Sequence, residues 1–386
     1  MWDRNGGCIV FVRHKINQWH NLLVVITLLF VSQIQGAGAV TIPAGAVYTM
    51  DNSAFGNRIY IYHRFNNGRV AFAGAISTGG LGTGESLGNQ GAIQIGPAES
   101  YLYAVNAGSN NISTFQITEE GLVLLQTVPS QGERPLSLTV GRERLYVLNA
   151  GGSAGTSDSI AGFHIDLEGL LTPISGSVAA LSADVTRPAQ VGLSPDGAAL
   201  VVTERETHKI TIFDIDSLGV PSKRRVYDSE GLTPFGFEFG VRGALVVAEG
   251  VLGDTEASSV SSYGLDYEAR LNVITSSART FQTAACWLVL SPDKKMAFTT
   301  NPASDSISRF SINFDGELSL ERHWSRLLKK GDRPLDITIT KDTKTLYVLL
   351  SGSDQLAVIP TQRFRRRARV VQRVNTPSGA NGLAVR

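Results

Sequence analysis

The stretch that decides the fold is 101-YLYAVNAGSNNISTFQI-117, which reads as an apolar strand, a short polar turn and a second apolar strand. A version of its first strand occurs seven times, and successive copies start 43 to 55 residues apart. The copies are 47-VYTMDN, 102-LYAVNA, 145-LYVLNA, 200-LVVTER, 245-LVVAEG, 297-AFTTNP and 346-LYVLLS. Self-similarity at this period indicates a repeat architecture.

Each copy is followed by a second strand with apolar residues on both faces. In six copies an aliphatic residue is followed three positions later by an aromatic one, as in Ile112 and Phe115. Positions three apart on a strand point to opposite faces, so each sheet is expected to lie between two others. A Gly-bearing turn and a third strand follow in most copies, and an apolar strand such as 136-LSLTV-140 then leads to the next copy.

Seven units of four strands predict an all-β fold, a seven-bladed β-propeller of four-stranded antiparallel blades. The first copy begins at Val47 without an inner strand before it, and the chain finishes with 382-GLAV-385, which has the character of an inner strand. We therefore expect the C-terminal strand to join the first blade and close the ring, because closure removes free sheet edges. Residues 40–386 are expected to form this single domain.

The N-terminus has a different character. Arg13, His14 and Lys15 precede the apolar run 22-LLVVITLLFV-31, and small residues follow up to Ala39. This order is typical of a secretory signal peptide, and the run is shorter than the roughly 20 residues that span a bilayer. Residues 1–39 are predicted to be a signal peptide, so the mature protein would be secreted, periplasmic or on the cell surface, without stable membrane insertion. A retained anchor is the alternative.

Charge and cysteine content restrict the partners. The formal net charge of +1 gives no electrostatic reason to expect a nucleic-acid partner. After removal of the signal only Cys286 remains, so an internal disulfide is impossible and stability must come from packing. The sequence has neither a zinc-type His/Cys spacing nor a nucleophile elbow. We expect a monomer without a cofactor that takes a small anionic substrate.

The stretches 101–117 and 187-RPAQVGLSPDGAALVVTERETHKITIFDID-216 resemble the lactonase family of seven-bladed propellers. This family includes bacterial 6-phosphogluconolactonase and fungal 3-carboxy-cis,cis-muconate cyclase. The resemblance is greatest to an exported branch with 79-GGLGTGESLG-88, 234-PFGF-237 and 282-QTAACW-287. It implies a lactone hydrolase or a muconate-type cycloisomerase. In the family's enzymes a suggested catalytic His follows the Pro matched by Pro188, where this sequence has Ala189, and an acid and a base match Glu204 and Lys209.

Candidate site residues are expected at one mouth of the propeller axis, where the loops before the inner strands gather. Three arginines each directly precede a Pro and could bind a carboxylate or phosphate. Arg187 is a candidate to stabilise the oxyanion of an attacked lactone carbonyl, and Glu204 or Glu249 is a candidate general base. The predicted substrate-binding residues are Arg134, Arg333, Gln190, Gln282, Lys209 and Asn149.

Three alternatives remain open from the sequence. The arginines could brace their loops instead of binding a ligand. Glu204 and Glu249, with Asn106, Asn149 and Asn301, could offer oxygen ligands to calcium. The protein could also be a non-catalytic binding propeller, because the family's His is missing.

Overall fold

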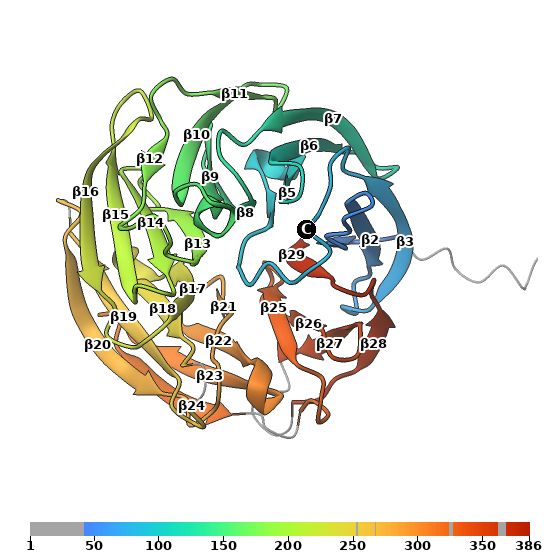
Figure 1. The fold of residues 1–386 in the computed structure, drawn as a ribbon. Helices are drawn as coiled ribbons and strands as arrows, with labels where there is room; N and C mark the ends of the chain where they lie inside the picture. The colour runs from blue at the N-terminus through green and yellow to red at the C-terminus, as the bar shows by residue number, and fades with distance from the viewer. Residues whose placement is uncertain (1–41, 252–253, 267, 324–326, 362–367) are drawn as a thin grey trace, which may run out of the picture. The chain divides into compact units, whose positions relative to one another are not determined.

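Seven antiparallel sheets are arranged in a ring around a central axis (Figure 1). The computed structural model describes residues 42–386, except 252–253, 267, 324–326 and 362–367. The predicted signal peptide lies outside the described residues. Within those ranges no helix has the length and apolarity needed to cross a bilayer.

Each blade has four strand positions from the axis outward. The inner strands are β29 (Asn381–Val385), β4 (Ile93–Ile95), β8 (Pro135–Val140), β13 (Pro188–Leu193), β17 (Pro234–Phe239), β21 (Leu288–Leu290) and β25 (Pro334–Ile339). The second strands are the seven sequence repeats: β1 (Gly45–Met50), β5 (Tyr101–Asn106), β9 (Arg144–Asn149), β14 (Ala199–Glu204), β18 (Leu245–Glu249), β22 (Met296–Asn301) and β26 (Thr345–Leu350).

The two outer positions complete the blades. The third strands are β2 (Arg58–Arg64), β6 (Asn111–Ile117), β10 (Ser159–Ile165), β15 (Lys209–Ile215), β19 (Ser259–Leu265), β23 (Ser306–Ile312) and β27 (Gln355–Pro360). The outermost are β3 (Val70–Ser77), β7 (Leu122–Pro129), β11 (Leu171–Pro173) with β12 (Ala179–Ala180), β16 (Pro221–Asp228), β20 (Leu271–Arg279), β24 (Leu318–His323) and β28 (Gln372–Asn375). Short 3-10 turns are η2 (Pro97–Glu99), η3 (Gly151–Ala154), η4 (Val241–Gly243) and η5 (Pro302–Ser304).

The ring closes as the sequence predicted. The sheet order β29-β1-β2-β3 places the C-terminal strand inside the first blade, with Val385 opposite Val47. Thr49 Oγ1 donates to the carbonyl of Asn381 at 3.3 Å, and Arg64 Nε donates to the carbonyl of Arg386 at 3.0 Å. The first and last parts of the described chain therefore share one sheet.

The blades bury both faces against their neighbours, which confirms the meaning of the aliphatic–aromatic pattern. Ile112 and Phe115 are both fully buried, as are their counterparts in the other blades. Tyrosines also join adjacent blades: the hydroxyl of Tyr103 donates to the carbonyl of Gly169 at 3.0 Å, and that of Tyr146 donates to Gly219 at 2.9 Å. Burial of both faces explains why no disulfide is needed for this packing.

The inner strands are linked by side chains that reach the backbone of the next blade. The Gln190 amide accepts from Phe237 N at 2.8 Å and donates to its carbonyl at 3.0 Å. Ser137 Oγ accepts from Val191 N at 3.2 Å. Inner strands have a free edge at the axis, so such links satisfy backbone groups that no further strand can reach.

One link comes from outside the inner strands. The segment 78–92 between β3 and β4, here called the connector, crosses the middle of the ring (Figure 1). Its Gln90 amide accepts from Leu288 N at 2.9 Å and donates to Leu288 O at 2.7 Å. It occupies the space beside Gly236, where a Cβ would overlap Gln90 Oε1 and lie 2.8 Å from the Cys286 carbonyl oxygen. Gly236 is therefore required for Gln90 to reach β21.

We expect Gly236→Ala to lower the free energy of unfolding by roughly 1–3 kcal/mol, because the methyl group must displace both Gln90 and backbone atoms. Gly264→Ala is the matched control, since its Cβ would meet only ordinary contacts at 3.8 Å and 3.9 Å. Urea denaturation of both variants measures the difference. Equal unfolding midpoints for the two variants would contradict the assignment of Gly236 to this role.

Candidate functional site

The loops that begin the inner strands share one backbone conformation at the mouth. Arg134, Arg187, Thr233 and Arg333 each precede a Pro and have positive φ values of 55°, 45°, 57° and 48°. Their carbonyls accept N–H groups from the turns that follow the second strands; Arg187 O, for example, accepts from Arg205 N at 3.4 Å. The backbone therefore fixes where these arginine side chains leave the ring.

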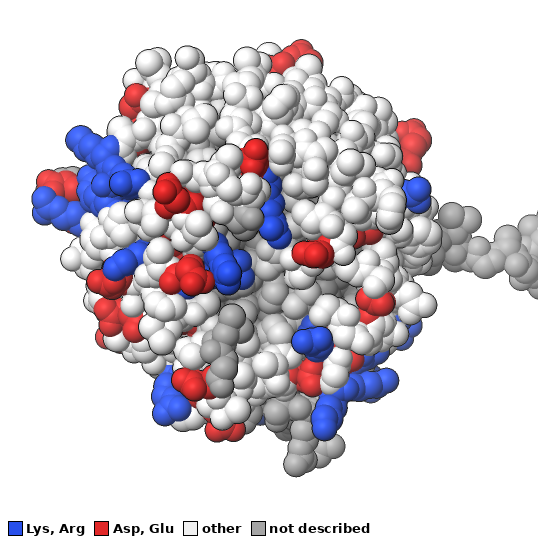
Figure 2. All heavy atoms as spheres, viewed as in Figure 1, with Lys and Arg blue, Asp and Glu red and all other residues white. Residues whose placement is uncertain are grey.

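The three predicted arginines differ in their surroundings. Arg187 is 65% exposed and lies 3.5 Å from the carboxylate of Glu206. Arg134 donates its backbone N–H to Asn110 Oδ1 at 2.8 Å, and its side chain lines a groove. Arg333 is exposed, and its backbone N–H donates to Asp305 Oδ1 at 2.7 Å. All three lie on mouth loops, and in Figure 2 basic side chains lie beside the central hollow with acidic side chains near them.

A fourth arginine, which the sequence reasoning missed, lies among them. Arg205 is partly buried; its Nε donates to Arg187 O at 2.9 Å and its guanidinium lies over the ring of Phe235, 5.5 Å from the centroid. Burial lowers the pKa of Arg205 most; the charges of Arg187 and Arg134 lower it further, while Cys286 and Glu206 act in the opposite direction. Those two guanidinium groups are therefore close enough to repel it.

The carboxylate of Glu204 is fully buried at the end of β14 and points into its own blade. It accepts hydrogen bonds from Ser182 N at 3.1 Å, from Thr211 Oγ1 at 2.6 Å and from Thr207 Oγ1 at 2.7 Å. The Ser182 hydroxyl also donates to it. A carboxylate with this many donors is held as a structural acceptor, and the general-base role predicted for Glu204 stays a prediction.

Glu249 has the equivalent position in the next blade and the same kind of surroundings. It is fully buried at the end of β18, and its oxygens accept from Gly231 N at 2.9 Å and from Ser259 Oγ at 2.5 Å. Burial raises the pKa of Glu249, against the hydrogen bonds that lower it. Its donors belong to the blade, so its predicted role as a base also stays untested.

Asparagines occupy this strand-end position in other blades. Asn149 is fully buried and donates to the carbonyl of Ser130 at 3.2 Å. Asn106 and Asn301 are likewise buried and donate to serines of their own third strands. Asn106 Oδ1 accepts from Asn57 Nδ2 of the first blade at 2.9 Å, whereas the buried oxygens of Asn149 and Asn301 have no hydrogen-bond partner among the described residues. Among the described residues, no three His, Cys, Asp or Glu side chains come together as a metal site would require.

The other predicted binding residues have partners within the scaffold. Gln190 is 9% exposed and links β13 to β17, as described above. Gln282 accepts from Ser306 Oγ at 2.7 Å and donates to the Phe281 carbonyl at 2.5 Å. Lys209 forms an ion pair with Asp228 of the outermost strand of its blade. These contacts give all three side chains partners within the scaffold.

The position at which the family's enzymes have the suggested catalytic His is held by the buried Ala189 in this chain. Ala189 is fully buried, and its carbonyl accepts from Gln90 N at 3.1 Å. Trp287 Nε1 donates to the carbonyl of the neighbouring Asn89 at 2.7 Å, so the connector is held from two blades. The Gly-rich segment thus forms the connector, and its end at Asn89 and Gln90 is held by inner strands of the ring.

Two cavities lie near the axis. A groove of about 350 Å³ is lined by mouth residues that include Glu85, Asn110, Glu133 and Arg134. A second cavity of about 210 Å³ is lined by Gln90, Gln94, Glu238 and Asp336. Burial raises the pKa of Glu238, and it raises the pKa of Asp336 to about 7. The carboxyl groups of this second cavity offer no positive charge to an anionic ligand, which leaves the mouth as the candidate site.

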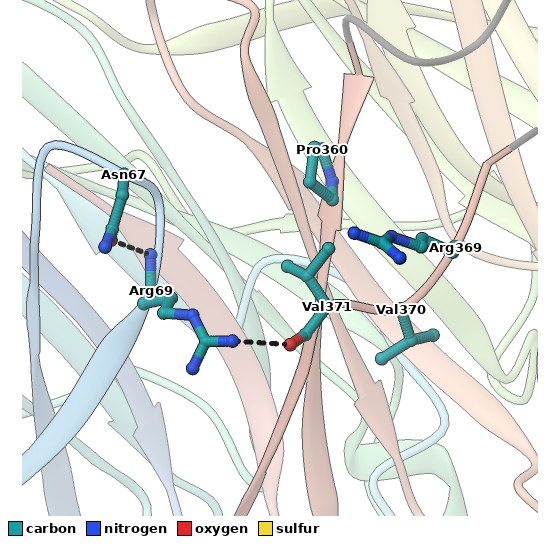
Figure 3. A pocket seen from close by; sticks show the side chains of 6 residues that line it. All are labelled: Asn67, Arg69, Pro360, Arg369, Val370 and Val371. Carbon is teal, nitrogen blue, oxygen red and sulfur yellow. Dashed lines mark hydrogen bonds between the residues drawn. The ribbon is translucent and has the colours of Figure 1, made fainter.

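A larger cavity of about 590 Å³ lies at the seam of the first and last blades (Figure 3). Arg69 donates to the carbonyl of Val371 at 3.2 Å across it, and Pro360, Arg369 and Val370 also line it. None of the predicted site residues belongs to its lining. Size alone therefore does not identify the site.

Cys286 is buried and unpaired, as expected, and burial raises its pKa to about 12.

Comparison with known proteins agrees with this architecture. Residues 57–185 match the sequence profile of the family described as lactonase, 7-bladed beta-propeller. No curated protein matches the sequence. A Bacteroides fragilis protein assigned as a 6-phosphogluconolactonase is 17% identical, with a TM-score of 0.70 over 90% of this chain and 100% of that one. A periplasmic gluconolactonase of Pseudomonas aeruginosa is 16% identical, with a TM-score of 0.70 over 88% of this chain and 98% of that one.

At these identities the solved structures establish the fold, and the profile match adds the family's sequence pattern. The resemblance to the lactonase family of seven-bladed β-propellers is thus confirmed, carried by residues 57–185 and by a ring of the same fold.

Proposed function

We propose that this protein is an exported lactone-processing enzyme, a hydrolase or a cycloisomerase, that binds a small anionic substrate at the mouth. The observation that carries the proposal is the group of guanidinium ions at the mouth, Arg134, Arg187 and Arg205, beside the carboxylate of Glu206. Fold alone would not suffice, because one fold can host many activities. Export rests on the N-terminal sequence pattern and is supported by the periplasmic location of one structural relative.

In this proposal each group has a defined task during lactone hydrolysis. Water attacks the ring carbonyl, and its proton passes to an exposed carboxylate, for which Glu206 is the best placed. Arg187 stabilises the negative oxygen that forms at the carbonyl carbon. The C–O bond of the ring then breaks, and the leaving alkoxide takes up a proton. The buried Glu204 and Glu249 are retained only as positioning residues.

A panel of lactones and muconates assayed with the protein lacking residues 1–39 tests the proposal. We expect turnover of at least one anionic lactone, with Arg187→Ala lowering kcat/KM at least tenfold, about 1.4 kcal/mol of transition-state stabilisation. Glu206→Gln should lower kcat. Arg242→Ala is the matched control, since that side chain is 66% exposed. Absence of turnover across the panel, or equal activity in the Arg187 and Arg242 variants, would refute the assignment.

The alternative function is anion binding without catalysis. It is favoured by Ala189, which stands where the family's enzymes have the suggested catalytic His and which is fully buried, with its carbonyl bonded to Gln90 N. Saturable binding of an anionic lactone that stays intact would support this alternative.

A further inference from the structure

The side chain of Arg205 is the strongest candidate for a ligand-binding group at the mouth. Its Nε donates to Arg187 O, but neither terminal nitrogen has a hydrogen-bond acceptor among the described residues. Within the same residues no carboxylate lies at ion-pair distance from it. The guanidinium is nonetheless partly buried. A charge partly removed from water gains from an anionic partner, so this arrangement favours the binding of an anion.

The guanidinium of Arg205 has two close neighbours, the ring of Phe235 and the connector. Cζ of Arg205 lies over the ring of Phe235, 5.5 Å from the centroid. The connector approaches at Gly88, where a Cβ would lie only 3.0 Å from Nη1. With Nε committed to a carbonyl, Nη1 and Nη2 remain as a pair of donors at the end of the side chain. Such a pair matches two oxygens of one carboxylate or phosphate group.

The surrounding charges favour the same ligand. Arg134 and Arg187 both act on Arg205 as positive neighbours. The nearest acidic group is Glu206, which is exposed and is already paired with Arg187 at 3.5 Å. Glu85 and Glu133 line the adjoining groove beside Arg134. None of these three acidic side chains forms an ion pair with Arg205, although Glu206 acts on it from a longer distance.

We propose that Arg205 anchors the oxyanion group of the ligand, a carboxylate or a phosphate ester, end-on through Nη1 and Nη2. The identity of that ligand as the substrate rests on the proposed function, whereas the anion site itself does not. Arg205 would then determine specificity by holding the acidic end of the molecule while Arg187 faces the reacting carbonyl.

Titration calorimetry of the full-length protein with inorganic phosphate and, separately, with acetate tests the site. We expect saturable binding of at least one of the two anions, and the tighter anion indicates whether the ligand carries phosphate or carboxylate. Arg205→Gln should raise the Kd at least tenfold, whereas Arg242→Gln should leave it unchanged. Equal binding in the Arg205 variant, or no saturable binding of either anion to the unmodified protein, would overturn the proposal.

A stability measurement keeps the test decisive if the variant is difficult to handle. Because an unpaired cation is unfavourable, we expect Arg205→Gln to be at least as stable as the parent in anion-poor buffer, and phosphate to raise the Tm of the parent alone. A lower Tm of the variant in that buffer would instead make Arg205 a structural residue.

If the anion binds but no lactone is turned over, the proposed function fails while the anion site stands. Where turnover exists, Arg205→Lys should raise KM more than it lowers kcat.

Discussion

Replacement of Asp336 by Asn is expected to stabilise the protein at pH 8 by up to about 4 kcal/mol. Asp336 is 3% exposed in the axial cavity and accepts a hydrogen bond from Gly382 N at 3.2 Å. Burial raises its pKa from 3.8 to about 7. The group therefore contributes stability that is fully present below pH 3.8 and is lost as the pH rises through 7. Asn stays neutral and can still accept from Gly382.

Urea denaturation between pH 4 and pH 8 measures this effect. The variant should gain over the parent only as the pH rises, and Glu238 in the same cavity leaves part of the pH dependence in place. Asp332 is the matched control, because it is also 3% exposed. Burial alone would raise its pKa, but hydrogen bonds from Arg373 hold the pKa below its usual range. Asp332→Asn should therefore lose stability at neutral pH, and a loss for Asp336→Asn at pH 8 would contradict the protonation assigned here.

Replacement of Glu204 by Ala is expected to lower the free energy of unfolding by roughly 3–5 kcal/mol. The substitution leaves Ser182 N and the hydroxyls of Thr207 and Thr211 without their acceptor in a buried place. Glu204→Gln keeps the shape but offers one accepting oxygen instead of two, so its cost should be smaller, about 1–3 kcal/mol. Thermal and urea unfolding measure both variants.

This result also separates a scaffold role from catalysis. For a scaffold, Glu204→Gln should lower the unfolding midpoint while activity per folded molecule stays within a few-fold of the parent. A general base would behave in the opposite way, with kcat lost and the midpoint unchanged. Arg187→Ala provides the stability control, because loss of a side chain that is 65% exposed should change stability by less than about 0.5 kcal/mol.

The fold was predictable because every blade repeats the same periodic pattern. The seven repeat strands lie within two residues of the positions expected from the sequence, and the final strand closes the first blade. Apolar residues on both faces of a strand leave little freedom, since each face must be covered. The prediction of the fold therefore did not depend on the conformation of any individual loop.

The site was harder to predict than the fold, because its residues lie just after strand ends and show no periodic pattern. Glu204 and Arg205 are neighbours, and successive side chains leave a strand on opposite sides. Once Glu204 turns into its blade, Arg205 faces the mouth, yet the sequence does not reveal which of the two is inward. Gln90 was similarly hidden, because a Gly-rich segment has no periodicity and its path depends on space left by Gly236, far away in sequence.

The path of the connector affects the surroundings of any ligand near the axis. Gln90 bonds to Ala189, Ser137 and Leu288, which belong to three different blades, so the connector is tied to the ring at several points around the axis. A molecule bound beside Arg205 would therefore lie against a segment that three blades hold in place. The connector also makes the seven similar blades inequivalent. An asymmetric ligand at the mouth therefore meets different surroundings in each orientation.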